Sequence, residues 1–358
     1  MCKKINRFFP CLLGFYFVAS FLIGLWLQLA QTDLPYWLGC IISELLLLAP
    51  VIVYIAANKI NVLACIISEL LLLIPVIVYI AVNKINVLAC IPYRKLRWQD
   101  ALMSLLAGYL LIPVITAINA FSSFFTTNYV QESAPECTTY PFVIQVILIA
   151  VIPALVEEFV FRGVFYHSYR KNGLVGAMLF SAIAFGVVHM NLNQFFYAVV
   201  IGLFFAKMVE VTGSMWSSVL AHFAVNTYSI TVIQIMKMAG IDAFAASQSA
   251  QTQSDILSQL AGELGNSDAA LAAGKVMGLF LAVVSIVSLI MVAAIFGMLA
   301  ILIINHMAKK NGRYDYYRYY TKMGLKPMNN ENFVTVPYAA TVILAFIYMV
   351  VIEVMQFL

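Results

Sequence analysis

The chain has 358 residues, of which 63% are hydrophobic and only 10% are charged, and its formal net charge is +4. Soluble globular proteins carry about 25% charged residues, so this composition excludes a soluble enzyme or binding module. The apolar runs are continuous rather than alternating, which excludes an outer-membrane barrel. No basic, aromatic-interleaved patch suggests a nucleic acid as partner. We therefore expect an all-α fold, a polytopic bundle of transmembrane helices.

The amino-terminal region, residues 1–100, begins with a basic segment and an apolar run. Lys3, Lys4 and Arg7 precede a hydrophobic stretch from Phe8 to about Ala30. This stretch is too long for the hydrophobic part of a signal peptide, and no small-x-small cleavage site follows it. We interpret it as an uncleaved first span.

A tandem repeat of 25 residues follows. Residues 40–64 recur as residues 65–89, and the two copies differ only at Ala49/Ile74 and Ala57/Val82. Two nearly identical copies are too few and too similar for a solenoid, so they indicate a recent duplication or an artefact of sequence assembly. When only one copy is counted as a crossing, the loop charges give a consistent orientation. We therefore expect eight functional spans plus one extra hydrophobic helix, which either spans the membrane with unfavourably placed flanks or lies at the periphery of the bundle.

The distribution of basic residues predicts which loops are cytoplasmic. Basic segments lie at residues 1–7, 94–97, 170–171 and 309–326, whereas the loops at 126–139 and 237–268 are acidic or poor in Lys and Arg. The positive-inside rule places the basic set and the amino terminus in the cytoplasm. This predicts a multi-pass plasma-membrane protein whose carboxyl terminus is outside.

Three further regions follow residue 100 in this interpretation. Residues 101–236 form the functional core, residues 237–270 form a polar extracytoplasmic loop, and residues 271–358 form the last helices with a basic cytoplasmic loop. Within that loop, the segment Lys309–Lys326 interleaves five tyrosines with basic residues. We expect this segment to lie against anionic lipid headgroups.

One span of the core carries three ionisable side chains. Glu157, Glu158 and Arg162 lie inside an apolar run from about Phe142 to Phe165, which is long enough to cross a bilayer. A charge near the bilayer centre costs on the order of 3 kcal/mol. Glu158 and Arg162 are four residues apart, so they share a helix face and can pair, while Glu157 lies about 100° away. The cluster is either a structural ion pair or a catalytic carboxylate supported by an arginine.

Two later spans add polar groups. His189 closes the apolar run after residue 174, and His222 and Asn226 share a face of the run 215–236. A single buried histidine is more often a hydrogen bond between helices than a catalyst. Two histidines, an asparagine, two glutamates and an arginine over three spans instead indicate a convergent polar site. Asn191, Asn193 and Gln194 could admit water or substrate there, or could simply be polar residues of an interfacial loop.

The order of these residues resembles the CAAX-protease and bacteriocin-processing (CPBP, or Abi) family of intramembrane endopeptidases, which includes the type II CAAX prenyl endopeptidases. Three motifs carry the resemblance: Glu157-Glu158-x-x-x-Arg162, Phe185-x-x-x-His189 and His222-x-x-x-Asn226. Each motif alone is weak, but all three in this order, each in a hydrophobic segment, are specific. The resemblance covers about residues 142–228.

The resemblance implies peptide-bond hydrolysis inside the membrane. In such proteases the first glutamate of the pair, here Glu157, acts with His189 to activate a water molecule, and His222 and Asn226 stabilise the oxyanion. The resemblance thus gives catalytic residues Glu157, His189, His222 and Asn226, with Glu158 and Arg162 as supporting residues.

The resemblance leaves the cofactor open. Some family members have been called metalloproteases, and Glu157, His189 and His222 would be the three zinc ligands if a metal were present. No His-Glu-x-x-His motif of the usual zinc proteases occurs, so we favour a glutamate mechanism without a cofactor. The expected substrate is a membrane peptide or lipidated protein. The alternatives are a non-catalytic immunity or scaffold protein, as in bacteriocin immunity, and a transporter.

Overall fold

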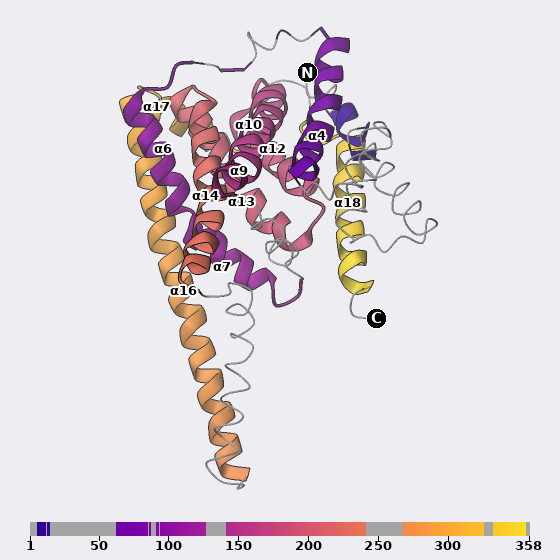
Figure 1. The fold of residues 1–358 in the computed structure, drawn as a ribbon. Helices are drawn as coiled ribbons and strands as arrows, with labels where there is room; N and C mark the ends of the chain where they lie inside the picture. The colour runs from indigo at the N-terminus through magenta and orange to yellow at the C-terminus, as the bar shows by residue number, and fades with distance from the viewer. Residues whose placement is uncertain are drawn as a thin grey trace.

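A computed structural model describes residues 6–11, 13–14, 62–84, 86, 91–92, 94–126, 141–240, 268–325 and 332–355. In this part of the chain the structure is built from helices and contains no strand, which confirms the predicted all-α class (Figure 1). The first span, the first repeat copy and the long polar loop lie almost entirely outside the described residues.

Six helical segments of the described chain are long and apolar enough to cross a membrane. They are Trp98–Ser122, Phe142–Arg170, Leu192–Thr212, Trp216–Met238, Val283–Lys310 and Val336–Met355. Each corresponds to a predicted span. The predicted span that ends at His189 is the shorter helix α12 (Leu174–Val188), whose 15 residues rise only about 22 Å.

Two of these spans are not single regular helices. The first consists of α6 (Trp98–Leu110) and α7 (Ile112–Ser122), which meet at Leu111. Pro113 lacks the N–H that would bond to the carbonyl of Tyr109, so the expected kink at this proline is confirmed. The second contains α9 (Phe142–Gln145), η2 (Val146–Val151), α10 (Ile152–Glu158), η3 (Phe159–Phe165) and α11 (Tyr166–Arg170).

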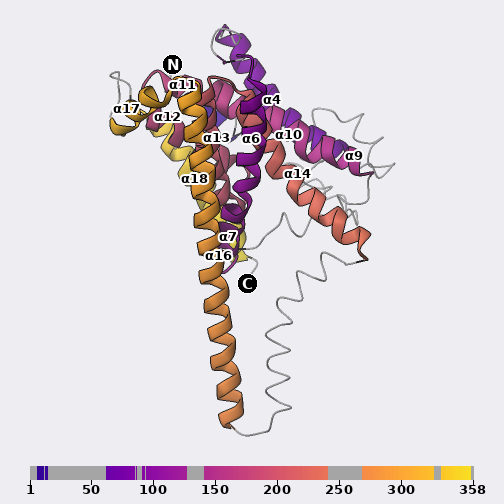
Figure 2. The same ribbon diagram turned by 90° about the vertical axis from the view of Figure 1, so that its left-hand side faces the viewer.

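Four of the remaining helices pack against this composite span, namely α4 (Val62–Val82), α12, α13 (Leu192–Thr212) and α14 (Trp216–Met238). The others are α16 (Asp268–Lys310), α17 (Tyr314–Lys322) and α18 (Val336–Met355). Helix α16 has 43 residues and extends well beyond the bundle (Figures 1 and 2). Helices α6 and α14 approach closely at Gly108, where an added Cβ would lie 2.4 Å from the carbonyl oxygen of Ala221. This contact positions the residue that follows, His222.

The second repeat copy forms most of α4. Helix α4 packs against η2, α10 and η3, and its buried residues Leu72, Val76 and Tyr79 face the core. The ring of Tyr79 stacks on Phe8 at 4.4 Å between centroids. The second copy is therefore part of the bundle rather than a peripheral helix.

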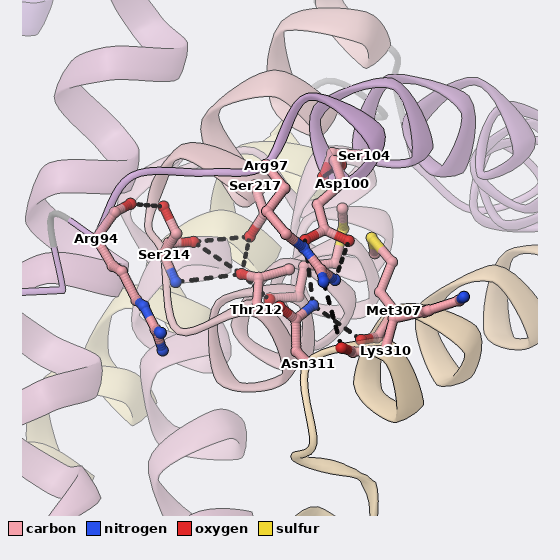
Figure 3. A network of polar contacts seen from close by, with 11 residues as sticks. Arg94, Arg97, Asp100, Ser104, Thr212, Ser214, Ser217, Met307, Lys310 and Asn311 are labelled. Carbon is pink, nitrogen blue, oxygen red and sulfur yellow. Dashed lines mark hydrogen bonds and ion pairs between the residues drawn. The ribbon is translucent and has the colours of Figure 1, made fainter.

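The basic segments that were predicted to share one side of the membrane meet at one end of the bundle. Arg97 bonds to Asp100 at 2.9 Å and donates to the carbonyl oxygen of Lys310 at 3.3 Å, and Asn311 donates to Asp100 at 3.2 Å (Figure 3). In the same network, Ser214 donates to the carbonyl oxygen of Arg94 at 2.6 Å. These bonds join the starts of α6 and α14 to the end of α16.

Candidate active site

The paired glutamates lie between two π-helical segments. Glu157 and Glu158 end α10, while η2 precedes that helix and η3, which carries Arg162, follows it. Such wide turns are rare and occur frequently at functional sites. They also rotate the side chains that follow, so the register of this span could not be predicted from a regular helical period.

The predicted pair between Glu158 and Arg162 is confirmed. Nη1 of Arg162 donates to Oε1 of Glu158 at 2.7 Å, and both side chains are fully buried. A buried carboxylate needs such a partner, because removing one member of a buried pair leaves an uncompensated charge.

His222 lies between the two carboxylates. Its Nδ1 is 3.0 Å from Oε1 of Glu158, and its Nε2 is 3.7 Å from Oε2 of Glu157. A carboxylate can only accept, so the assignment consistent with this contact places a hydrogen on Nδ1. Residues of α10, η3 and α14, which carry the first and third motifs, thus converge.

The ring of His189 is oriented by its own helix. Its Nδ1 lies 2.7 Å from the carbonyl oxygen of Phe185. A carbonyl oxygen only accepts, so Nδ1 carries the hydrogen and the lone pair of the neutral ring is on Nε2. The Phe185 ring meets the rings of His189 and His222 edge-on, with centroids 4.9 and 5.9 Å apart. Phe185 therefore links the two histidines.

The amide of Asn226 has a different partner from the other motif residues. Its Nδ2 donates to the carbonyl oxygen of Ile149 at 3.0 Å. Four residues further on, Pro153 has no N–H with which to form the α-helical bond to that carbonyl. Asn226 thus satisfies an acceptor in η2, and its second amide hydrogen is not used in this bond.

Two aromatic rings flank Arg162, and neither was among the site residues predicted from the sequence. The guanidinium lies 4.3 Å from the centroid of Phe185 and 5.2 Å from that of Phe205. In the described structure, its Nε and Nη2 have no hydrogen-bond partner. The two ring faces are therefore its main contacts besides Glu158, and cation–π contacts in desolvated surroundings contribute about 2 kcal/mol. The aromatic position in the second motif was the available signal for Phe185.

A third carboxyl group near the site comes from the second repeat copy. Glu69 lies on the face of α4 that packs on α10, in line with Leu72 and Val76, and one of its carboxyl oxygens is buried. The helix on which α4 packs, α10, ends with Glu157 and Glu158. The repeated Ser-Glu pair was visible in the sequence, but only the packing of α4 brings it to this site.

The polar residues after His189 have structural partners. Asn191 caps α13 by accepting from the N–H of Gln194 at 3.2 Å. Nδ2 of the buried Asn193 lies 2.9–3.1 Å from three hydroxyl oxygens at the end of α7, those of Ser122, Ser123 and Thr126. The structure thus favours the simpler alternative, in which these residues hold the α12–α13 turn in place.

The three candidate metal ligands are not arranged as a closed metal site. Among the described residues, no group of three His, Cys, Asp or Glu side chains could hold a metal ion. The bond from Nδ1 of His222 to Glu158 is compatible with either mechanism, because a metal-bound histidine also donates its other ring N–H to a carboxylate.

Comparison with known proteins places this site in a family. Residues 139–228 match the family model described as "Type II CAAX prenyl endopeptidase Rce1-like". This segment of the chain is similar to the CAAX protease family. All six polar motif residues of the site lie inside the matched CAAX protease segment.

A curated relative supports the same family. The chain is 27% identical over 111 residues to the protein named "Putative membrane peptidase YdiL" of Bacillus subtilis (strain 168). The aligned region is 31% of this chain and 44% of the relative, so the chain spans less than half of that protein's length. No solved structure matches the chain.

Proposed function

We propose that this protein is an intramembrane endopeptidase that hydrolyses a peptide bond with a water molecule activated by Glu157 and His189. The family match and the convergence of buried polar groups within spanning helices support this function. The observation that carries it is the contrast between the two glutamates. Glu158 is fully buried and bonded to Arg162 and His222, whereas the side chain of Glu157 is 14% exposed.

This contrast gives the two carboxylates different roles in the proposed mechanism. Glu158 has its Oε1 occupied and is inaccessible, so it orients His222. Glu157 retains access for water and accepts a proton as the water oxygen attacks the carbonyl carbon. Nε2 of His189 has the lone pair needed to accept a hydrogen bond from the same water. Collapse of the tetrahedral intermediate breaks the C–N bond, and the proton passes from Glu157 to the leaving amine.

The oxyanion would be stabilised by His222 and Asn226. Nδ1 of His222 is engaged with Glu158, so a donor at Nε2 requires the doubly protonated ring. The second amide hydrogen of Asn226 is available for the same purpose. Removing one such donor typically lowers the rate on the order of 100-fold.

The proposed substrates are membrane-associated peptides, either CAAX-like segments of lipidated proteins or leader peptides. The proposed location is the plasma membrane, with the amino terminus in the cytoplasm. We propose the glutamate mechanism rather than a metalloprotease mechanism, since the side chains alone supply a base and oxyanion donors.

The test compares the wild type with Glu157→Gln. Both are purified in detergent and incubated with membrane peptides, and new termini are identified by mass spectrometry. New termini are expected only with the wild type, and they should still form in a strong chelator. Glu353→Gln, the same substitution in α18, is the matched control and should retain cleavage.

Three other outcomes would contradict the proposed function or its mechanism. Equal folding of both proteins with identical peptide spectra would contradict the protease and favour a non-catalytic immunity or scaffold protein. Loss of cleavage in chelator, restored by zinc, would contradict the metal-free mechanism. Solute flux that depends on Glu157, without new termini, would indicate a transporter.

A further inference from the structure

Helix α17 has two different faces. Tyr314, Tyr317 and Tyr320 are partly buried and pack against the core. The opposite face consists of Asp315, Tyr316, Arg318, Tyr319 and Lys322, all exposed, and we call these five residues the outer face of α17. The side chains of Tyr316 and Tyr319 are 43% and 62% exposed. A helix with one docked face and one exposed aromatic and basic face is suited to lie in a membrane interface.

The body of the protein holds α17 in place. Arg170, at the end of the catalytic span, bonds to Glu210 twice at 2.9 Å, and its guanidinium lies 5.5 Å from the ring centroid of Tyr316. Arg313, immediately before α17, donates to the main-chain oxygen of Glu210. The outer face is therefore presented by a fixed helix rather than by a free loop.

The surroundings of α17 mark the level of a membrane interface. The bonds in Figure 3 place the start of α6 and the start of α14 at the same end as α17. Trp98 and Trp216 begin these helices and are 69% and 40% exposed. Exposed tryptophan and tyrosine side chains at helix ends are typical of the headgroup region.

The charge at this end is unbalanced at the surface. Asp100 and Glu210 are buried and paired with Arg97 and Arg170, so their negative charge is neutralised internally. Lys309, Lys310 and Lys171 next to α17 are exposed, as are Arg318 and Lys322 on it. Asp315 is the one exposed acidic residue of α17. The local excess of positive charge is complementary to phosphate groups.

We propose that the outer face of α17 binds the headgroups of anionic phospholipids. The phosphates would contact Arg318 and Lys322, while Tyr319 inserts at the level of the glycerol backbone and Tyr316 stays bonded to Arg170. Attraction of a basic side chain to an anionic membrane surface corresponds to about a fivefold change in affinity per charge. This site is separate from the proposed catalytic chemistry and does not depend on it.

The test uses the full chain reconstituted with phosphatidylcholine alone or mixed with phosphatidylglycerol. Thermal unfolding is followed as the phosphatidylglycerol fraction rises. We expect the wild type to be stabilised, and Arg318→Gln and Lys322→Gln each to weaken the apparent lipid affinity about fivefold. Lys237→Gln, an exposed lysine at the end of α14, is the matched control and should leave the affinity unchanged.

Three results would overturn the proposal. Equal weakening by Lys237→Gln would show that overall charge, rather than this face, is responsible. Stabilisation by inorganic phosphate alone would assign the face to a soluble phosphate compound. The same unfolding temperature in both lipids for the wild type would exclude binding of this face to a lipid surface. An acidic protein would then be the partner that its charge favours.

Discussion

Arg162 is the residue on which the other polar groups of the site depend. It is fully buried, bonds to Glu158 and is enclosed by Phe185 and Phe205. Gly202 allows this enclosure, since an added Cβ would lie 3.2 Å from Nη2 of the arginine. Arg162 therefore acts on His222 through Glu158. This role does not require a direct contact between Arg162 and the reacting atoms.

Replacement of Arg162 should destabilise the fold. In Arg162→Met, Glu158 becomes a buried carboxylate without its cation, and breaking such a pair costs about 3–5 kcal/mol. Thermal or denaturant unfolding in detergent measures the loss. The double variant Glu158→Gln/Arg162→Met should recover part of it, because no charge is then left unpaired. A double variant as unstable as the single one would contradict this account.

Asn226 can be tested for its structural role separately from catalysis. If its main task is to satisfy the carbonyl of Ile149 that Pro153 leaves free, Asn226→Ala should destabilise the protein by about 1–3 kcal/mol. Pro153→Ala restores an N–H at that position and should reduce this loss.

A double-mutant cycle of Asn226→Ala and Pro153→Ala, followed by both unfolding and cleavage, distinguishes the two roles. Recovery of stability without recovery of cleavage would support an oxyanion role in addition to the structural one. Independent effects of the two substitutions on stability would show that the proline and the amide are not linked through Ile149.

At the scale of elements, the duplicated segment contributes directly to the surroundings of the site. Helix α4 packs along the composite span, and Glu69 lies on its face toward α10, the helix that ends with Glu157 and Glu158. Glu44 is the corresponding residue of the first repeat copy and lies outside the described residues.

Glu69→Gln tests whether this carboxyl group adds a negative charge near the paired glutamates. Removing such a charge from a poorly solvated region should stabilise the fold by about 1 kcal/mol, as measured by thermal unfolding. A loss of stability in Glu69→Gln would contradict this account.

At the scale of the whole molecule, the basic segments lie together at one end. Segments that were assigned to one side of the membrane from their Lys and Arg content are joined there by bonds from Arg97, Arg170 and Arg313. The segments richest in Lys and Arg therefore share one side of the bundle, as the expected orientation requires.

The orientation can be checked by labelling. In a protein whose native cysteines are replaced, Lys322→Cys and Lys237→Cys place one exposed thiol near each end of the bundle. An impermeant thiol reagent added to intact cells should label Lys237→Cys, and Lys322→Cys should react only after the membrane is opened. Labelling of both positions in intact cells would contradict the predicted orientation.

Local features of the sequence determined a large part of this description. Continuous apolar runs predicted the spanning helices because each must satisfy its own backbone bonds in lipid. The four-residue spacing of Glu158 and Arg162 predicted their pair, and Pro113 predicted the break between α6 and α7. The three motifs predicted which spans supply the polar residues, since their residue types and order are specific to one family.

Only the tertiary structure decided how these residues meet. It placed His222 between Glu157 and Glu158, gave Asn226 the carbonyl of Ile149 as its partner, and brought Glu69 to the site. Lipid-facing and helix-facing surfaces are equally apolar, so helix neighbours are selected by close packing and interhelical hydrogen bonds rather than by hydrophobic pattern. The π-helical turns also change the helical register of the composite span, which carries Glu157 and Glu158. The apolar runs in the sequence therefore determined the helices, whereas packing between distant segments determined the site.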